Sequence, residues 1–418
     1  MQETKNKNGA VIIIAGLFFI LGFITWLNGL LIPHLKTACE LSNFQALFVA
    51  FAFYISFTVM ALPSSWLLDK IGFKNGMSVG LWVMALGALV FIPAAYSRTF
   101  SNFLIGLFVL GTGMAILQTA VNPYITILGP IESAAKRISI MGIANKVAGA
   151  IAPIILAYFV VKEGDDEIIN NLSTMLPADK ELFLDSLAER VIYPYIIMAI
   201  ILGFVGLALR FSNLPSINLN SENSTENSEK DKDSVFAYPY LVFGVITLFF
   251  YVGAEVIAGD TIIRYGQSIG ISMETAKNFT SYTLIGMLVG YIMGIILIPK
   301  IISQHKALQI SASLGIIFTL GAIFTSGFIS VMFIAILGLA NALVWPAVWP
   351  LAIQGLGKHI KTGSALLIMA ISGGAILPLA WGKMSDLFNS QTAYFILIPA
   401  YLFILFFASY GYKIKNWK

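Results

Sequence analysis

The sequence predicts an all-α membrane protein with twelve transmembrane helices in two pseudo-symmetric six-helix halves. Three observations lead to this prediction: the composition, the number of long apolar stretches and a short internal repeat. Of the 418 residues, 58% are apolar and only 11% are charged, whereas soluble domains carry about 25% charged residues. The lipid bilayer is therefore the expected surrounding, and the formal charge of +4 gives no indication of nucleic-acid binding.

Twelve stretches are apolar over about the 20 residues that a helix needs to cross the bilayer core. In chain order they are 10–32, 44–68, 76–96, 101–128, 138–161, 191–211, 238–266, 277–299, 307–326, 328–352, 362–383 and 391–411. Between the sixth and the seventh, residues 212–236 are rich in Ser, Asn, Glu and Lys and predict a disordered linker. The expected domains are an N-terminal half, 1–211, this linker, 212–236, and a C-terminal half, 237–418.

The connections between these stretches predict the orientation in the membrane. Of the 25 Lys and Arg residues, sixteen lie in one set of alternate connections and eight in the other, while Lys146 lies inside a span. The richer side is expected to be cytoplasmic, so both termini should lie inside a bacterial inner (plasma) membrane. On the opposite side, residues 162–190 predict a long acidic loop with a short amphipathic helix around Glu181–Arg190.

A short repeat supports two related halves. Ala-Val-Asn-Pro at 120–123, in the fourth stretch, recurs as Ala-Val-Trp-Pro at 347–350, in the tenth. Residues 148–153 in the fifth stretch likewise resemble residues 373–378 in the eleventh. Because these matches fall at equivalent stretches, they indicate duplicated halves, a common organisation of secondary transporters.

The sequence offers no enzymatic or metal-binding motif. Cys39 is the lone cysteine, which excludes an intrachain disulfide, and His34, His305 and His359 are not at metal-ligand spacing. Neither a nucleophile elbow nor a phosphate-binding glycine loop is present. We therefore expect a protein that is not an enzyme, holds no metal, and uses no cofactor besides a coupling ion, Na⁺ or H⁺.

Gln118 and Asn122 are the first candidate binding residues. They are four residues apart in the fourth stretch, so they share one helical face, next to Pro123. An unpaired amide in hydrocarbon costs several kcal/mol, about 2–7, so this face must look into the helix bundle or into a wet cavity. Two interpretations are open: the amides tie neighbouring helices together, or they face a ligand.

The tenth stretch carries a second polar and aromatic face. Asn341, Trp345 and Trp349 are spaced four residues apart, and Pro346 and Pro350 weaken the helix around them. A tryptophan belt at the membrane interface is the alternative, which fits Trp349 better than Trp345. Aromatic rings beside carboxamides suit a neutral, polyhydroxylated ligand, because rings cover its C–H faces and amides bond to its hydroxyls.

Lys146 and Glu255 are charged residues deep inside predicted spans, where a charge costs at least about 2.5–3.5 kcal/mol. They form either a structural ion pair or a functional group. In the functional interpretation Glu255 binds ligand or a coupling ion, and Lys146 holds a ligand hydroxyl or supplies a fixed positive charge that permits uniport. Asp260 is a further coupling candidate, although its spacing from Arg264 predicts a local ion pair.

The stretch Asp69-Lys70-Ile71-Gly72-Phe73-Lys74 resembles the cytoplasmic signature loop of the major facilitator superfamily, with Ser65 where that pattern usually has glycine. Longer motifs resemble its fucose/glucose/galactose sugar:cation symporter branch. They lie at 27–35, 118–130, 250–255 and 371–375. The resemblance implies a secondary active transporter that imports a neutral hexose by alternating access. It also implies a monomer, with Asp69 and Lys70 in a cytoplasmic gate.

Two positions depart from the proton-coupled fucose members of that branch. Gly29 and Gln118 stand where those members carry an aspartate and a glutamate, and glutamine at 118 also fits glucose/galactose members, some of them sodium-linked. Lys146, directly after Asn145, is a further departure. Asn28 and Asn145 complete the expected binding residues. Alternatives to cation-coupled import are a sugar uniporter and proton-driven efflux of organic cations.

Overall fold

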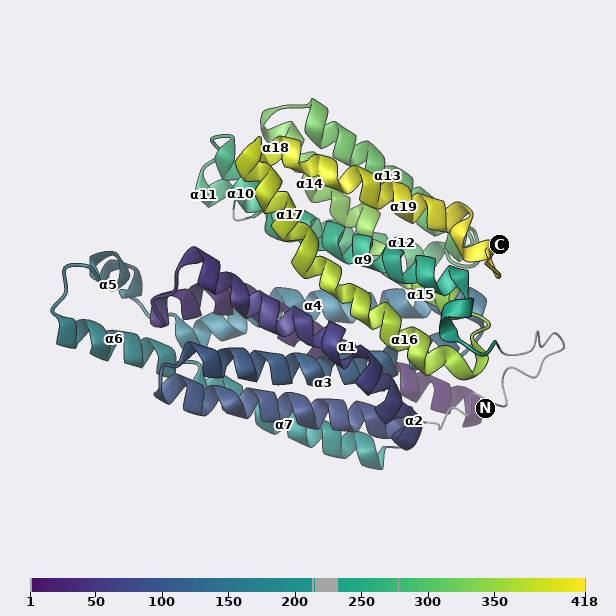
Figure 1. Cartoon of the computed structure of the whole chain (residues 1–418), viewed down its shortest axis with the longest axis horizontal. Coiled ribbons are helices and arrows are strands. Elements are labelled where there is room, and N and C mark those ends of the chain that lie inside the picture. The colour runs from purple at the N-terminus through teal and green to yellow at the C-terminus, as the bar shows by residue number, and fades with distance from the viewer. Residues whose placement is uncertain (1, 213, 215–231, 277, 418) are drawn as a thin grey trace.

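A computed structural model describes residues 2–212, 214, 232–276 and 278–417 of the chain, without the side chains of residues 2–8, 28, 29, 43, 44, 47, 166, 273 and 274. The described residues form helices joined by short connections (Figure 1). Residues 215–231, the larger part of the predicted linker, lie outside the described ranges.

The helices fall into two groups that follow each other along the chain (Figure 1). The N-terminal half contains α1 (Gln2–Ala38), α2 (Asn43–Tyr96), α3 (Phe100–Ile127), α4 (Ala134–Val160), α5 (Asp165–Asn171), α6 (Pro177–Glu189) and α7 (Ile192–Phe211). The C-terminal half contains α9 (Pro239–Asp260), α10 (Ile262–Ser268), α11 (Met273–Ala276), α12 (Phe279–Leu297), α13 (Gln304–Phe324), α14 (Gly327–Ala342), α15 (Val344–Ile353), α16 (Ile360–Met369), α17 (Gly373–Leu387), α18 (Ser390–Ala393) and α19 (Leu397–Ser409).

The described residues include 11 helices long and apolar enough to cross a membrane. One of them, Phe48–Tyr96, has 49 residues, about 73 Å at the helical rise of about 1.5 Å per residue, which is enough for two crossings. Its helical geometry breaks at Gly72, where φ is 76°, a left-handed conformation that glycine adopts without steric cost. The second and third predicted spans are therefore the two arms of α2, and the twelve-span prediction is confirmed.

The two halves meet at one end of the molecule and diverge at the other (Figure 1). Both termini lie at the end where the halves meet, and α16 there packs against α2 and α3. At the diverging end lie α5 and α6 of one half and α10 and α11 of the other. Farther inside, α12 and α15 pack against α4, so α4 is a main contact between the halves.

The short amphipathic helix predicted around Glu181–Arg190 is confirmed as part of α6, but the rest of the predicted loop at 162–190 is more helical than expected. This segment folds into α5 and α6, and Pro177 starts α6 at a position where its missing N–H is not needed. Asp165 accepts hydrogen bonds from Arg190 at 2.5 and 3.0 Å. Burial alone would raise the pKa of Asp165, but the bonds from Arg190 and from the Lys162 backbone outweigh it and lower that pKa below its ordinary value.

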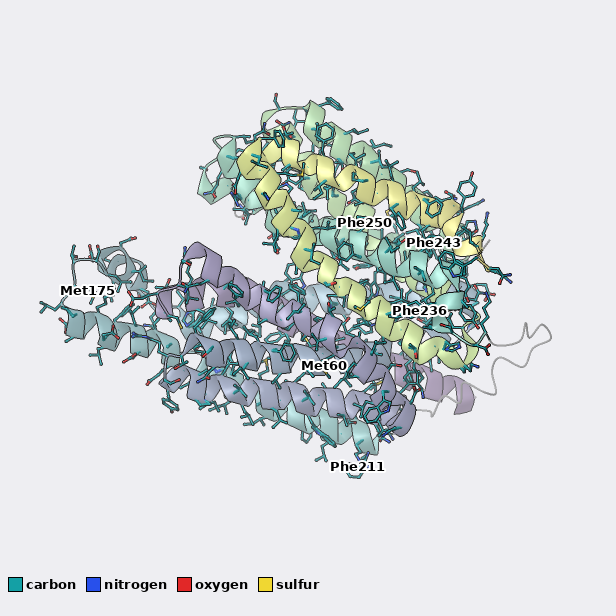
Figure 2. All side chains as sticks on the ribbon, in the orientation of Figure 1. Met60, Met175, Phe211, Phe236, Phe243 and Phe250 are labelled. Atoms are coloured by element: carbon teal, nitrogen blue, oxygen red, sulfur yellow. The ribbon has the colours of Figure 1, made fainter. Side chains whose placement is uncertain are left out.

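Large apolar side chains cover the outside of both halves. Phe211 is 78% exposed and points away from α7 in Figure 2, and Ile154 and Phe204 are 70% and 69% exposed. Such side chains at the surface fit a chain that is surrounded by hydrocarbon rather than by water, because lipid tails solvate them.

A close helix contact holds α4 against α1. A Cβ placed on Gly22 of α1 would lie 2.1 Å from the carbonyl oxygen of Asn145, far inside van der Waals contact, so only glycine allows this approach. One helical turn farther along both helices, Trp26 of α1 covers Gly149 of α4. A Cβ added to Gly149 would lie 2.5 Å from the indole Cδ1. These contacts fix the position of Asn145 and of Lys146, the next residue along α4.

Candidate functional site: a cavity between the two halves

A cavity of about 240 Å³ lies between the halves. Ligand sites for drug-sized molecules have about 300–1,000 Å³, so this cavity suits a smaller molecule. Side chains from α1, α2, α3, α4, α9, α12 and α15 contribute to its wall. Ile32 and Ala50 line it near the diverging end, while Gln118 and Trp345 line it nearer the other end. The cavity therefore reaches from the diverging end toward the middle of the membrane-spanning region.

Six of the predicted site residues line this cavity. They are Gln118, Asn145, Lys146, Glu255, Asp260 and Trp345. Gln118 is half-buried, and its amide presents two donors and one acceptor. The Asn145 amide donates to the Phe18 backbone carbonyl at 3.3 Å. The polar residues that the sequence singled out are thus brought together from α3, α4, α9 and α15.

Asn122 supports the cavity wall from behind. It is fully buried, donates to the Gln118 backbone carbonyl at 2.9 Å and accepts a hydrogen bond from Trp345 Nε1 at 3.3 Å. The Trp345 ring stacks on Trp349, with centroids 5.3 Å apart and planes at 27°. Asn122 therefore orients Trp345 across the boundary between the halves. Both interpretations of the fourth stretch hold in part: Asn122 ties helices together, and Gln118 faces the cavity.

Trp349 and Asn341 lie away from the cavity wall. Trp349 is fully buried, so the prediction that it suits an interfacial belt was wrong. Asn341 is also fully buried and accepts a hydrogen bond from the Tyr401 hydroxyl at 2.8 Å. It is not among the residues that line the cavity, which corrects its assignment as a binding residue. The side chain of Asn28, another predicted binding residue, lies outside the described part of the structure.

Lys146 and Glu255 form an ion pair between the halves, from α4 to α9. The Lys146 side chain is 7% exposed and that of Glu255 is 18% exposed. Lys146 also lies near the Trp26 ring, with Nζ 5.0 Å from the ring centroid. Because a buried charge needs a partner, this geometry explains how both residues are tolerated at this depth.

The predicted Asp260–Arg264 ion pair is wrong. Arg264 Nη2 instead contacts Asp386 Oδ1 at 3.1 Å. The physical reason is that α9 ends at Asp260 and the chain turns at Thr261, so Arg264 belongs to α10 and not to the next turn of α9. Asp260 lines the cavity, and among the described residues it has no ion-pair partner.

Aromatic residues complete the cavity wall, and sequence reasoning did not single them out. They are Phe18, Trp26, Phe53, Tyr54, Phe57, Tyr251 and Tyr291. Two of them stood next to recognised motifs: Trp26 precedes the 27–35 stretch, and Tyr251 lies within 250–255. Aromatic residues are frequent throughout this chain, so their type alone carried no signal.

The two halves are held together at the end that carries the termini. Asp69 of α2 pairs with Lys361 of α16 at 3.1 Å, and the hydroxyls of Ser65 and Thr362 are 3.1 Å apart. Lys70, the second predicted gate residue, stays within its own half and lies over the Trp66 ring, 3.6 Å from its centroid.

Gln304 adds a second contact at this closed end. Its Oε1 accepts from the Ala135 backbone N–H and its Nε2 donates to the Ile131 backbone carbonyl, both at 2.9 Å. Gln304 begins α13 of the C-terminal half, whereas Ile131 and Ala135 lead into α4 of the N-terminal half. The cavity is therefore closed toward the termini and reached from the diverging end.

The helix arrangement and the central cavity define a two-half membrane transporter. The chain belongs to the major facilitator superfamily, whose family model matches residues 14–377. A glucose/galactose transporter of Brucella abortus is 35% identical over 415 residues, covering 99% of this chain and 96% of that protein. The L-fucose-proton symporter of Escherichia coli is 29% identical, with 94% and 91% covered.

A solved structure matches the fold over nearly the whole chain. The crystal structure of FucP, a major facilitator superfamily transporter, in the outward conformation superposes with a TM-score of 0.83 at 28% identity. The match covers 96% of this chain and 98% of that one. Together with the family match, this superposition confirms the major facilitator fold predicted from the signature loop.

Proposed function

We propose that this chain imports a neutral hexose of the glucose/galactose type, coupled to a monovalent cation, H⁺ or Na⁺, by alternating access. The observation that carries the proposal is the cavity between two related halves, lined by amides and aromatic rings and closed at one end. Relatives that span nearly the whole chain are named as transporters of glucose and galactose and of L-fucose. The protein acts as a monomer in the bacterial inner membrane, with both termini in the cytoplasm.

The lining suits a sugar more than a charged ligand. Trp345 offers a ring face to the apolar C–H side of a pyranose, while Gln118 and Asn145 offer amide donors and acceptors to its hydroxyls. Because Lys146 and Glu255 neutralise each other, neither is left as an open charge for an ionic substrate. This pairing removes Glu255 as an attracting group for the alternative of organic-cation efflux and leaves only Asp260, of the two carboxylates that this alternative uses, in that role.

Transport requires that the closed end of the cavity opens while the open end closes. In the described conformation, the contacts of Asp69 with Lys361 and of Gln304 with Ile131 and Ala135 close the end that carries the termini, which the proposal assigns to the cytoplasm. Breaking them while the diverging ends approach each other would move the cavity's opening to the other side of the membrane. The bound sugar stays at the middle of the membrane as the halves rock around it.

The test is uptake of radiolabelled glucose and galactose into proteoliposomes under a sodium gradient, a proton gradient or neither. We expect accumulation with one of the two gradients, inhibited by an excess of the unlabelled sugar. Equilibration without accumulation under either gradient would refute cation coupling and favour the uniporter. Absence of any uptake of glucose, galactose, fucose or mannose by monodisperse protein would refute the sugar assignment.

A further inference from the structure

The Lys146–Glu255 ion pair is the feature of the cavity that sugar recognition alone does not explain. Its two members come from different halves, α4 and α9, and both line the cavity. An amide–amide pair would serve a neutral sugar equally well, and would avoid placing two charges at a depth where each is costly. The pair therefore points to the handling of charge during transport.

We infer that Lys146 competes with the coupling cation for Glu255: it neutralises this carboxylate in the described conformation, which is open at the diverging end, and leaves it when the cation binds there. This inference rests on the proposed cation-coupled sugar import. Lys146 is thus a coupling residue that sets how much external cation is needed to load the carrier.

The competition follows from charge. A carboxylate inside the membrane needs a positive partner or a proton in every state, because an unpaired buried charge is strongly unfavourable. An ammonium group next to a carboxylate weakens its proton binding about 10- to 1,000-fold, and it excludes a metal cation from the same oxygen atoms in the same way. Cation binding and the ion pair at Glu255 are therefore mutually exclusive.

The structure also provides a second position for the displaced ammonium. The Trp26 ring lies 5.0 Å from Lys146 Nζ and faces the same cavity. A cation over an indole face is attracted by the electron density of the ring. Trp26 and Lys146 belong to the same half and their helices are packed together at Gly149. When the ammonium moves from Glu255 to Trp26, the halves lose this ionic link and are free to rock.

The other titratable groups around Glu255 do not replace Lys146. Those in the cavity wall are Tyr54 on α2, Tyr251 and Asp260 on α9, and Tyr291 on α12; Tyr401 on α19 lies behind the wall, bonded to Asn341. None of them is a base that is positively charged at neutral pH. Asp260 adds a second carboxylate nearer the diverging end, which attracts external cations toward Glu255.

The experiment measures how initial hexose uptake by proteoliposomes saturates with the external cation, in one series over pH without sodium and in another over sodium at fixed pH. The variants are Lys146→Gln, Lys146→Arg and the neutral double variant Lys146→Gln/Glu255→Gln. For Lys146→Gln we expect half-saturation at about a 10- to 1,000-fold lower concentration of the driving cation, which for protons means about 1–3 units higher pH. Lys146→Arg should stay close to the wild type, and the double variant should only equilibrate sugar.

Two results would overturn the inference. One is an unchanged half-saturating cation concentration in Lys146→Gln. The other is continued gradient-driven accumulation by the double variant, in which neither member of the pair is left as an unpaired charge that could prevent folding. Lys361→Gln is the matched control, since it also removes an ion pair between the halves but outside the cavity; its half-saturating concentration should not move. Hexose exchange by the wild type without any gradient tests the proposed function separately, so a failure of the proposed function can be distinguished from a failure of the inference about Lys146.

Discussion

Gln304 offers the sharpest test of how the conformation open at the diverging end is held. One side-chain amide satisfies two backbone groups of the opposite half, the Ala135 N–H and the Ile131 carbonyl, each at 2.9 Å. Ala135 lies in the first turn of α4 and Ile131 in the 3-10 turn just before it, and α4 also carries the cavity residues Asn145 and Lys146. Replacing Gln304 by alanine removes both bonds and changes nothing in the cavity.

The size of the effect follows from two hydrogen bonds. Each contributes about 0.5–1.5 kcal/mol net of solvation, so Gln304→Ala should destabilise the state open at the diverging end by about 1–3 kcal/mol relative to the state open at the other end. At RT of about 0.6 kcal/mol, the ratio of the first state to the second should fall about 5- to 160-fold. This change exceeds what an exposed ion pair such as Asp69–Lys361 contributes, about 0.2–1 kcal/mol.

The populations can be measured by double electron–electron resonance between spin labels at the diverging end. Exposed positions on the two halves are Leu182, on α6, and Phe328, on α14; each is changed to cysteine after Cys39 is replaced by serine. We expect Gln304→Ala to move molecules toward the shorter distance between the labels. The matched control is Gln309→Ala, which removes bonds to Ala408 and Ser409 within the C-terminal half. An unchanged distance distribution in Gln304→Ala, or an equal shift in Gln309→Ala, would refute the reasoning.

Three further predictions concern single residues. Gln118→Ala should weaken hexose binding at least about tenfold in equilibrium binding assays, whereas Gln309→Ala should not. Gly22→Ala would push α1 away from Asn145, because its Cβ would lie 2.1 Å from that carbonyl, and should lower the melting temperature of the detergent-solubilised protein. The lowered pKa of Asp165 means that its pair with Arg190 stabilises the fold above about pH 5 and loses that effect as the pH falls below about 4. The melting temperature of Asp165→Asn should therefore be lower than that of the wild type at neutral pH, and it should change less with pH across this range.

The overall fold could be predicted because it depends on properties visible in single stretches of sequence. Twelve apolar stretches set the spans, and the motif at 69–74 marked the connection between the second and the third, where the structure breaks the helix at Gly72. The position of Gln118 and Trp345 on the cavity also followed from spacing, because each lies on a helix with one polar face. Periodicity within a helix was enough for these residues.

The errors arose where helices end. The Asn341, Trp345 and Trp349 stripe assumed one continuous helix, but α14 ends at Ala342 and α15 begins at Val344, and Leu343 between them departs from helical geometry. The break turns Asn341 toward Tyr401 while Trp345 faces the cavity. No local signal could identify Glu255 as the partner of Lys146, because the two residues are 109 positions apart and meet only when the halves assemble.

The two helices of the 162–190 segment have a consequence for reagents that recognise the outer surface. Lys180 of α6 pairs with Glu40 at 2.5 Å, and Arg98 pairs with Glu181 and Asp185 at 2.5 and 2.9 Å. All these partners belong to the N-terminal half, so α6 travels with that half as one rigid body. An antibody fragment against α6 alone would mark the protein at the cell surface and leave its cycle running. A fragment that binds α6 and α10 together would span the diverging ends of the two halves and hold the carrier in one conformation.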